Sequence, residues 1–227
     1  LMLSGCQHGV SLPAADNAEA AETAVESIEE PAYKKFTDFD GDDIEDAAAL
    51  SIVDKDYAKL TVTLGRGKTL EEEIPGWWWF VDHETGRDSL EQTDVPVCDF
   101  DGDGKDEMLI QLAFAGSSGP SREIHIFKVE NDKLVELPLD YIFPDISDLP
   151  DKTDYLSQFK DINDNCLGAQ IVRGDDDRPL LRVRQYDLAT SNYDGSWYVD
   201  CAFTGQGWAV KRVTWSRVFP ELDGNEH

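Results

Sequence analysis

The 227-residue sequence predicts an all-β protein made of three antiparallel, propeller-like β-meander repeats of about 62 residues each. An acidic loop at residues 38–46 returns 61 residues later at residues 99–107, and a weaker copy begins at Asp161. A fourth echo begins at Asp223. After each of the first three loops, apolar and polar residues alternate in short runs separated by turn residues, which is typical of antiparallel strands. A single small meander cannot bury both of its faces, so the units must pack against one another.

The expected strands follow the three loops in order. Radial packing of the units would give a propeller, whereas face-to-face packing would give a β-sandwich. Three units are fewer than a usual closed propeller has, so a compact ring, an open arc and a sandwich all stay open. The predicted strand segments are 50–53, 60–64 and 77–81 in the first unit, 108–112, 123–129 and 134–137 in the second, and 170–172, 181–184, 197–199 and 208–215 in the third.

The charge balance limits the partners of the protein. There are 47 acidic against 20 basic residues, a net charge of -27. Nucleic acids and anionic membrane surfaces are bound by cationic surface, which this chain lacks, so neither is expected as a direct partner. With 41% hydrophobic residues, the chain can still form a buried core.

The first residues indicate export. Residues 1–6 read LMLSGC, an apolar run that ends in small residues before a cysteine, as at the end of a secretory signal. This run resembles the lipobox of bacterial lipoproteins. The resemblance implies that Cys6 becomes the lipidated first residue and that the protein is lipid-anchored in the bacterial cell envelope, outside the cytoplasm. The alternative is an ordinary buried cysteine near the start of the chain.

The rest of the chain divides by composition. Residues 7–32 are rich in Ala and Glu, contain no Lys or Arg, and have few large apolar side chains. Such a segment cannot offset its ordering entropy by burial, so we expect a flexible acidic tether. The β-repeat domain is predicted over residues 33–220, followed by a tail at 221–227.

The acidic loops have the composition of a cation site. In the second loop, Asp99, Asp101 and Asp103 alternate, Gly104 allows a sharp turn, and Glu107 follows at position nine. Calcium takes six to eight oxygen ligands, and alternating carboxylates on a tight loop can converge on one ion. An EF-hand is excluded because position twelve is not acidic in either loop.

This pattern resembles the Asp-x-Asp-x-Asp-Gly-x-x-Asp loop of integrin-type FG-GAP and VCBS-like β-propeller repeats. The resemblance implies one or two structural calcium ions, held between strands of units about sixty residues long. Carried over to this sequence, it makes ligands of Asp99, Asp101, Asp103 and Glu107 with the carbonyl of Lys105 in the second loop, and of Asp38, Asp40, Asp42 and Asp46 with the carbonyl of Ile44 in the first.

Two loops depart from the family pattern. Asp43 stands where the family prefers glycine, and aspartate tolerates positive φ better than most residues. In the third loop Asn163 and Asn165 replace aspartates, Cys166 replaces the glycine, and Ala169 takes the closing position. We expect this loop to keep its turn and to lose the ion. The alternative for all three loops is a set of solvated acidic turns, although close unpaired carboxylates repel one another.

The resemblance implies a non-enzymatic surface module, with structural calcium and a protein or glycan partner. Two alternatives stay open. An accessory or inhibitory subunit of an envelope protein predicts a sizeable apolar patch, for example around Trp77. A carbohydrate-active enzyme predicts a cleft with two carboxylates of raised pKa outside the calcium loops.

Other conspicuous residues have simpler explanations. Residues 77–80 (WWWF) either fill both faces of a buried strand or stack on sugars. His83, Glu84 and Asp88 match no known metal spacing, and residues 117–119 lack the pattern of a nucleophile elbow. Cys98, Cys166 and Cys201 allow at most one disulfide among themselves, and Cys98 and Cys201 are expected to be buried, inert thiols.

Overall fold

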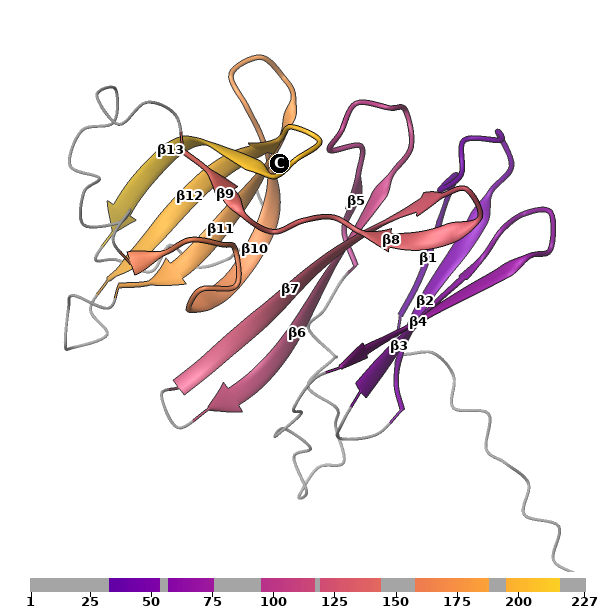
Figure 1. The fold of residues 1–227 in the computed structure, drawn as a ribbon, viewed down its shortest axis with the longest axis horizontal. Coiled ribbons are helices and arrows are strands. Elements are labelled where there is room, and N and C mark those ends of the chain that lie inside the picture. The colour runs from indigo at the N-terminus through magenta and orange to yellow at the C-terminus, as the bar shows by residue number, and fades with distance from the viewer. Residues whose placement is uncertain are drawn as a thin grey trace, which may run out of the picture. The chain divides into compact units, whose positions relative to one another are not determined.

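The computed structural model describes residues 33–53, 57–75, 95–116, 119–143, 158–187 and 195–216 (Figure 1). They form thirteen strands in three sheets, each containing a meander of four consecutive antiparallel strands. The all-β prediction is therefore confirmed. All three sheets belong to one compact unit that begins at Pro31.

The first sheet is a plain four-stranded meander. Ala58, Leu60 and Val62 alternate with partly exposed residues along one strand, so one face of the sheet turns to the core. Its strands, in sheet order, are β1 (Tyr33–Thr37), β2 (Asp46–Ile52), β3 (Tyr57–Thr63) and β4 (Thr69–Pro75).

The second sheet contains the two longest of the described strands and ends in a tight hairpin. Asn131 and Asp132 connect its last two strands with φ values of 49° and 61°, the two positive values that a tight type I′ hairpin requires. The strands are β5 (Val97–Cys98), β6 (Glu107–Gly116), β7 (Gly119–Glu130) and β8 (Lys133–Glu136).

The third sheet has a fifth strand that is out of chain order. A short strand that follows the second sheet pairs in parallel with the last strand, Tyr141 opposite Trp208 and Ile142 opposite Ala209. In sheet order the strands are β10 (Cys166–Arg173), β11 (Pro179–Tyr186), β12 (Ser196–Phe203), β13 (Trp208–Ser216) and β9 (Tyr141–Ile142).

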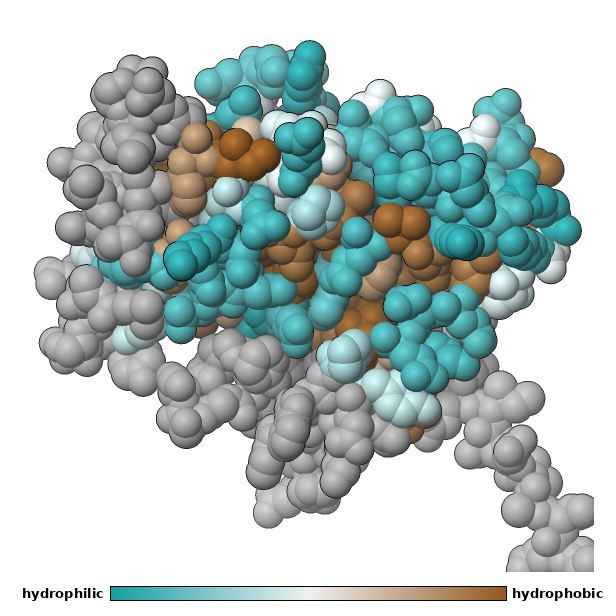
Figure 2. All heavy atoms as spheres, viewed as in Figure 1, coloured by the Kyte–Doolittle hydropathy of each residue, from teal (hydrophilic) through white to brown (hydrophobic). Residues whose placement is uncertain are grey.

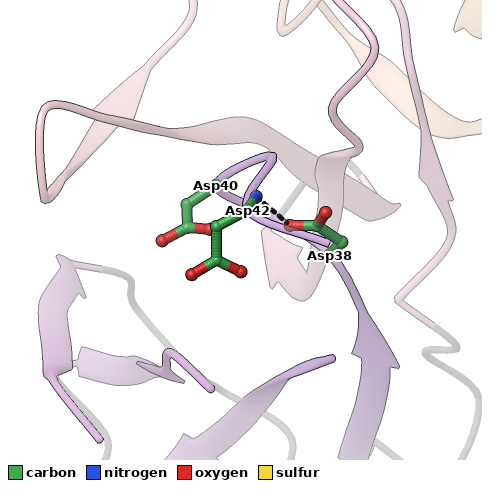
Figure 3. Close-up of side chains that lie close together, drawn as sticks. All are labelled: Asp38, Asp40 and Asp42. Carbon is green, nitrogen blue, oxygen red and sulfur yellow. Dashed lines mark hydrogen bonds between the residues drawn. The ribbon is translucent and has the colours of Figure 1, made fainter. Parts of the chain in front are cut away.

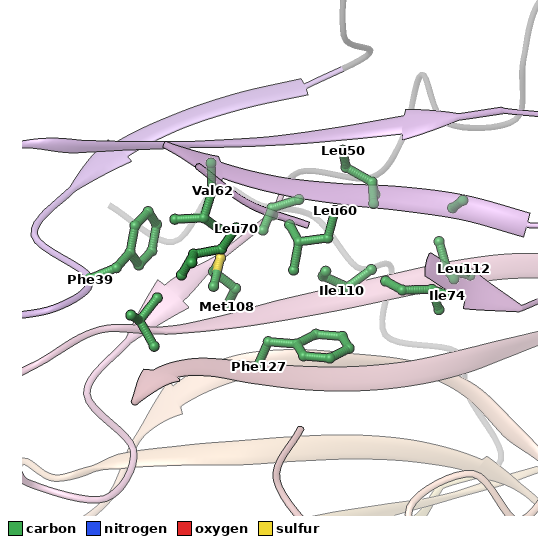
Figure 4. Close-up of a cluster of buried hydrophobic side chains, with 14 of the residues drawn as sticks. Phe39, Leu50, Leu60, Val62, Leu70, Ile74, Met108, Ile110, Leu112 and Phe127 are labelled. Atoms are coloured by element: carbon green, nitrogen blue, oxygen red, sulfur yellow. The ribbon is translucent and has the colours of Figure 1, made fainter. Parts of the chain in front are cut away.

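The second sheet is buried on both faces. Met108 and Ile110 pack with the first sheet in one core cluster, shown in Figure 4, whereas Leu109 and Ile126 pack with the third sheet in another. This explains why residues 108–110 of β6 form an unbroken apolar run, because neither face of that strand meets water. The three sheets are thus stacked face to face in chain order.

Most predicted strands overlap observed ones, but in the first sheet neither β1 nor β4 was predicted. The fourth strand, β4, was missed because three consecutive glutamates at 71–73 hide the alternation of Leu70 and Ile74, which both face the core. The very short strands β5 and β9 also gave no sequence signal.

Several predictions fall on residues that the structure does not describe. These are the lipobox with Cys6, the tether at 7–32, the strand at 77–81 with its aromatic run, His83, Glu84 and Asp88, residues 117–118, and the tail at 221–227.

Among the described residues, no helix is long and apolar enough to cross a membrane. The face drawn in Figure 2 is largely hydrophilic, and most of its visible hydrophobic residues lie near the middle of the view, between hydrophilic ones.

Candidate metal centre

The two strongest acidic loops occupy the same place in successive sheets. One connects β1 to β2 and the other connects β5 to β6 (Figure 1). The loops also touch each other. The Thr37 hydroxyl donates to Asp106 Oδ2 at 2.8 Å, and a Cβ on Gly41 would lie 3.0 Å from Cε of Lys105. The lack of a side chain at Gly41 therefore allows the loops to approach closely.

The first aspartate of each loop organises the turn around its own carboxylate. In the second loop, Asp99 Oδ1 accepts the N–H groups of Gly102 (2.7 Å) and Asp103 (3.1 Å), and Oδ2 accepts that of Gly104 (3.0 Å). The side chain thus replaces backbone partners that the tight turn cannot supply.

The first loop repeats this arrangement atom for atom. Asp38 Oδ1 accepts the N–H groups of Gly41 (2.7 Å) and Asp42 (3.2 Å), and Oδ2 accepts that of Asp43 (2.8 Å). Burial alone would raise the pKa of Asp38, but the backbone donors outweigh it and lower the pKa. The predicted positive φ at Asp43 is confirmed, at 63°.

The residue at position nine closes both loops from the start of the next strand. Glu107 Oε2 accepts the N–H of Phe100 at 2.7 Å, and Asp46 Oδ2 accepts the N–H of Phe39 at 2.8 Å. The remaining oxygens differ. Asp46 Oδ1 accepts the N–H of Gly65 at 2.7 Å, whereas Glu107 Oε1 is buried and has no hydrogen-bond partner.

In the second loop, this unpartnered oxygen belongs to a group of three carboxylates. One oxygen each from Asp99, Asp101 and Glu107 lie within 4.8 Å of one another. Burial, followed by the charges of Asp101, Asp103 and Asp99, raises the pKa of Glu107 to about 7. To stay ionised at this burial beside two other carboxylates, Glu107 needs a compensating positive charge.

The first loop brings together Asp38, Asp40 and Asp42, again with one oxygen each within 4.8 Å (Figure 3). The side chain of Asp40 is only 7% exposed, and its Oδ1 has no hydrogen-bond partner. Burial and the nearby charge of Asp46 raise the pKa of Asp40, although Arg66 acts in the opposite direction.

The donor set fits a hard cation. All the grouped atoms are carboxylate oxygens, and both groups contain a nearly buried oxygen without a partner, which is what calcium or a similar ion would satisfy. Asp46 and Asp103 lie outside the two groups, and Asp103 Oδ1 accepts the N–H of Lys105 at 2.9 Å. Ligation by these two side chains, and by the carbonyls of Ile44 and Lys105, stays a prediction.

The structure adds two basic residues that the sequence analysis missed. Arg66 Nη1 lies 2.8 Å from Asp40 Oδ2, an ion pair without hydrogen-bond geometry, and Lys128 Nζ donates to Asp101 Oδ2 at 3.2 Å. Burial lowers the pKa of Lys128, but the hydrogen bond and charge of Asp101 outweigh it and raise the pKa. One signal was present in the sequence, because Arg66 and Lys128 are 62 positions apart, close to the repeat length.

The third loop keeps its turn through different contacts. Asp161 Oδ1 accepts the N–H groups of Asn163 (2.7 Å) and Asp164 (3.1 Å). The Asn163 amide instead binds both backbone groups of Ile124 in β7, at 2.7 and 3.0 Å. The expectation that Cys166 takes the glycine position is wrong. Asn165 has the positive φ (51°), because β10 already begins at the next residue.

A pocket of about 420 Å³ lies beside the third loop, with carboxylates from Glu136, Asp140 and Asp161 in its lining. Burial, the first of several causes, raises the pKa of Asp161. Its Oδ1 is committed to the backbone of the loop, so the side chain has a structural task. Among the described residues, the enzymatic alternative can be tested at this pocket.

The three described cysteines are free thiols. Burial raises the pKa of Cys98 to about 11 and that of Cys166 to about 12, and it raises the pKa of Cys201 strongly. Thiolate is the reactive form, so these side chains are poor nucleophiles. Cys201 is buried as predicted, whereas Cys98 is only partly buried.

Comparisons of the chain with protein-family models, with curated proteins and with solved structures found no match. The repeats, the loop geometry and the carboxylate groups therefore carry the functional argument.

Proposed function

We propose that this protein is a calcium-binding β-repeat module in which the ions stabilise the loops at the starts of β2 and β6. The observation that carries the proposal is Glu107, whose buried Oε1 has no hydrogen-bond partner and lies in a group with Asp99 and Asp101. A bound divalent ion would supply the missing positive charge and hold the three carboxylates together.

The second loop is the stronger of the two sites. There, Glu107 keeps one oxygen free for an ion, whereas in the first loop both oxygens of Asp46 accept backbone N–H groups. The first site would rely on Asp38, Asp40 and Asp42 alone among the grouped carboxylates. We therefore expect two ions of unequal affinity.

At the level of the whole protein, we propose a non-enzymatic surface module that binds a protein or a glycan. The proposal rests on the repeated loops and on the lipoprotein-like residues 1–6, which would anchor the protein in a bacterial cell envelope through Cys6. In this role calcium is structural, because its expected ligands also form the turns.

The test is calorimetric titration of the chelator-treated full chain with calcium chloride, paired with thermal unfolding. We expect saturable binding with a dissociation constant of roughly 10⁻⁴ to 10⁻³ M, as in extracellular modules, and a rise in melting temperature. Glu107→Gln keeps the size of the side chain and removes its charge, so it should abolish the tighter of the two binding events.

The matched control is Glu71→Gln, the same chemical change at an exposed ion pair with Lys59 on β3 and β4. It should leave both binding events unchanged. Absence of binding heat and of stabilisation up to millimolar calcium would contradict the proposal.

A further inference from the structure

We propose that Arg66 and Lys128 are resident counter-cations of the two metal loops, each holding the third-position aspartate in the metal-free protein and competing with calcium for it. The inference rests on the proposed function, because it concerns the same carboxylates. It assigns to these two side chains the task of setting how tightly the loops bind an ion.

In the first loop, the guanidinium of Arg66 reaches in from the turn between β3 and β4. Its Nη1 lies 2.8 Å from Asp40 Oδ2 and 3.7 Å from Asp42 Oδ2, so it faces two of the three grouped carboxylates. Its Nη2 binds Asp132 in the turn between β7 and β8, where Lys68 Nζ also lies 3.2 Å from Asp132 Oδ2. Arg66 is thus held between an acidic loop of the first sheet and a turn of the second.

In the second loop, the equivalent charge comes from within a strand. Lys128, in β7, places Nζ 3.2 Å from Asp101 Oδ2 and 3.9 Å from Glu130 Oε1. The side chains of Lys128 and Asp101 are only 20% and 14% exposed, so water screens this pair weakly. In each loop, therefore, one positively charged side chain pairs with the aspartate at position three.

The consequence is a pair of effects with opposite signs. In the metal-free protein the resident cation offsets the repulsion among the carboxylates and stabilises the loop. A divalent ion on the same carboxylates would lie within a few ångströms of that cation, and the repulsion between the two would weaken ion binding. Removing the cation should therefore destabilise the metal-free protein and tighten calcium binding, whereas removing a ligand only weakens binding.

The experiment uses the full chain, with calcium titrations by calorimetry and thermal unfolding in the presence of a chelator. Arg66→Gln and Lys128→Gln should each lower the metal-free melting temperature and tighten calcium binding at one site by roughly tenfold, with a smaller gain at high salt. The two variants lie on different sheets, so the test does not depend on the folding of either one.

Two controls isolate the position of the charge. Lys68→Gln removes a neighbouring cation that pairs with Asp132 and not with a loop carboxylate, and it should change calcium affinity by less than about twofold. Arg66→Lys keeps the positive charge and should leave the affinity near that of the original protein.

The outcomes separate this inference from the proposed function. Absence of calcium binding in the original protein and in every variant overturns the proposed function. Binding in the original protein that is unchanged or weaker in both Gln variants overturns the counter-cation inference alone. Binding that emerges only when a cation is removed supports the inference, because it shows that the cation blocks the site.

Discussion

At the scale of single residues, the two metal loops differ at two positions that carry physical consequences. At position six, Asp43 adopts a φ of 63° where Gly104 adopts 88°, so the same turn is built once with a side chain and once without. At position nine, Asp46 is one methylene shorter than Glu107 and uses both oxygens on backbone N–H groups. The first loop is therefore the more strained and the less well equipped to bind an ion.

The strain at Asp43 can be measured. Asp43→Gly should raise the free energy of unfolding of the metal-free protein by about 0.5 kcal/mol, because glycine adopts positive φ without a Cβ penalty and one carboxylate is removed from the loop. Asp43→Asn removes the charge and keeps a side chain, so comparing the two variants by urea unfolding separates the backbone term from the charge term. Equal stability of the two variants would show that backbone strain contributes nothing.

At the scale of elements, the third sheet is tied together by a row of charges across three strands. Asp200 in β12 lies opposite Arg182 in β11 and Arg212 in β13, and it accepts hydrogen bonds from their Nε atoms at 2.6 and 2.8 Å. Asp200 is only 2% exposed. Burial would raise the pKa of Asp200, but the bonds and charges of the two arginines outweigh it and lower the pKa.

This row predicts a pH dependence of stability. Because the folded pKa of Asp200 lies below the unfolded value of about 3.9, its contribution is present above about pH 4 and is lost as the pH falls through the folded pKa. Asp200→Asn should cost about 2 kcal/mol in unfolding free energy at pH 7, and this cost should decrease as the pH falls below about 4. Urea unfolding across this range tests it, with Asp175→Asn at an exposed turn position as the control. A cost that does not vary with pH would contradict the charge-based explanation.

The sequence predicted elements well where side-chain alternation is regular and poorly where it is not. Segments of β6, β7 and β8 were predicted because apolar residues mark them clearly, and the Asn131-Asp132 turn lies between two of these predicted segments. The strands β1, β4, β5 and β9 were missed. Three glutamates hide the alternation of β4, and β1, β5 and β9 are short.

The same limit applies to the candidate site. The aspartates of each loop were predicted because they are close in sequence and equally spaced. Arg66 and Lys128 approach the loops only through the folding of the following hairpins, so no local pattern shows their position. Whether the carboxylate at position nine keeps a free oxygen likewise depends on a residue distant in the sequence. Gly65 donates its N–H to Asp46 Oδ1, whereas Glu107 Oε1 has no hydrogen-bond partner.

At the scale of the whole molecule, side-chain amides join the second and third sheets. Gln111 in β6 donates to the carbonyl of Ala169 at 2.7 Å and accepts its N–H at 2.9 Å. Asn163 makes the same two-point contact with Ile124, which lies directly opposite Gln111 across β6 and β7. These bonds supply side-chain partners to backbone groups of β10 and β7 and connect the two sheets.

Removal of one of these amides tests whether the sheets unfold together. Gln111→Met should lower the unfolding free energy by about 2 kcal/mol, because it leaves both backbone groups of Ala169 without these partners. In urea, a single transition with an unchanged m-value is expected, since the sheets share their cores. Gln206→Met, the same change at an exposed turn position, is the control. Two separate transitions would show that the third sheet unfolds independently.

The parallel pairing of β9 with β13 also sets the order in which the sheets can be completed. The first sheet needs no residue beyond Pro75, because all four of its strands lie upstream of that point. The third sheet must wait for residues 208–209 before its out-of-order strand gains a partner. Until then the second sheet has one apolar face uncovered, so a chain that ends before residue 208 should be prone to aggregation.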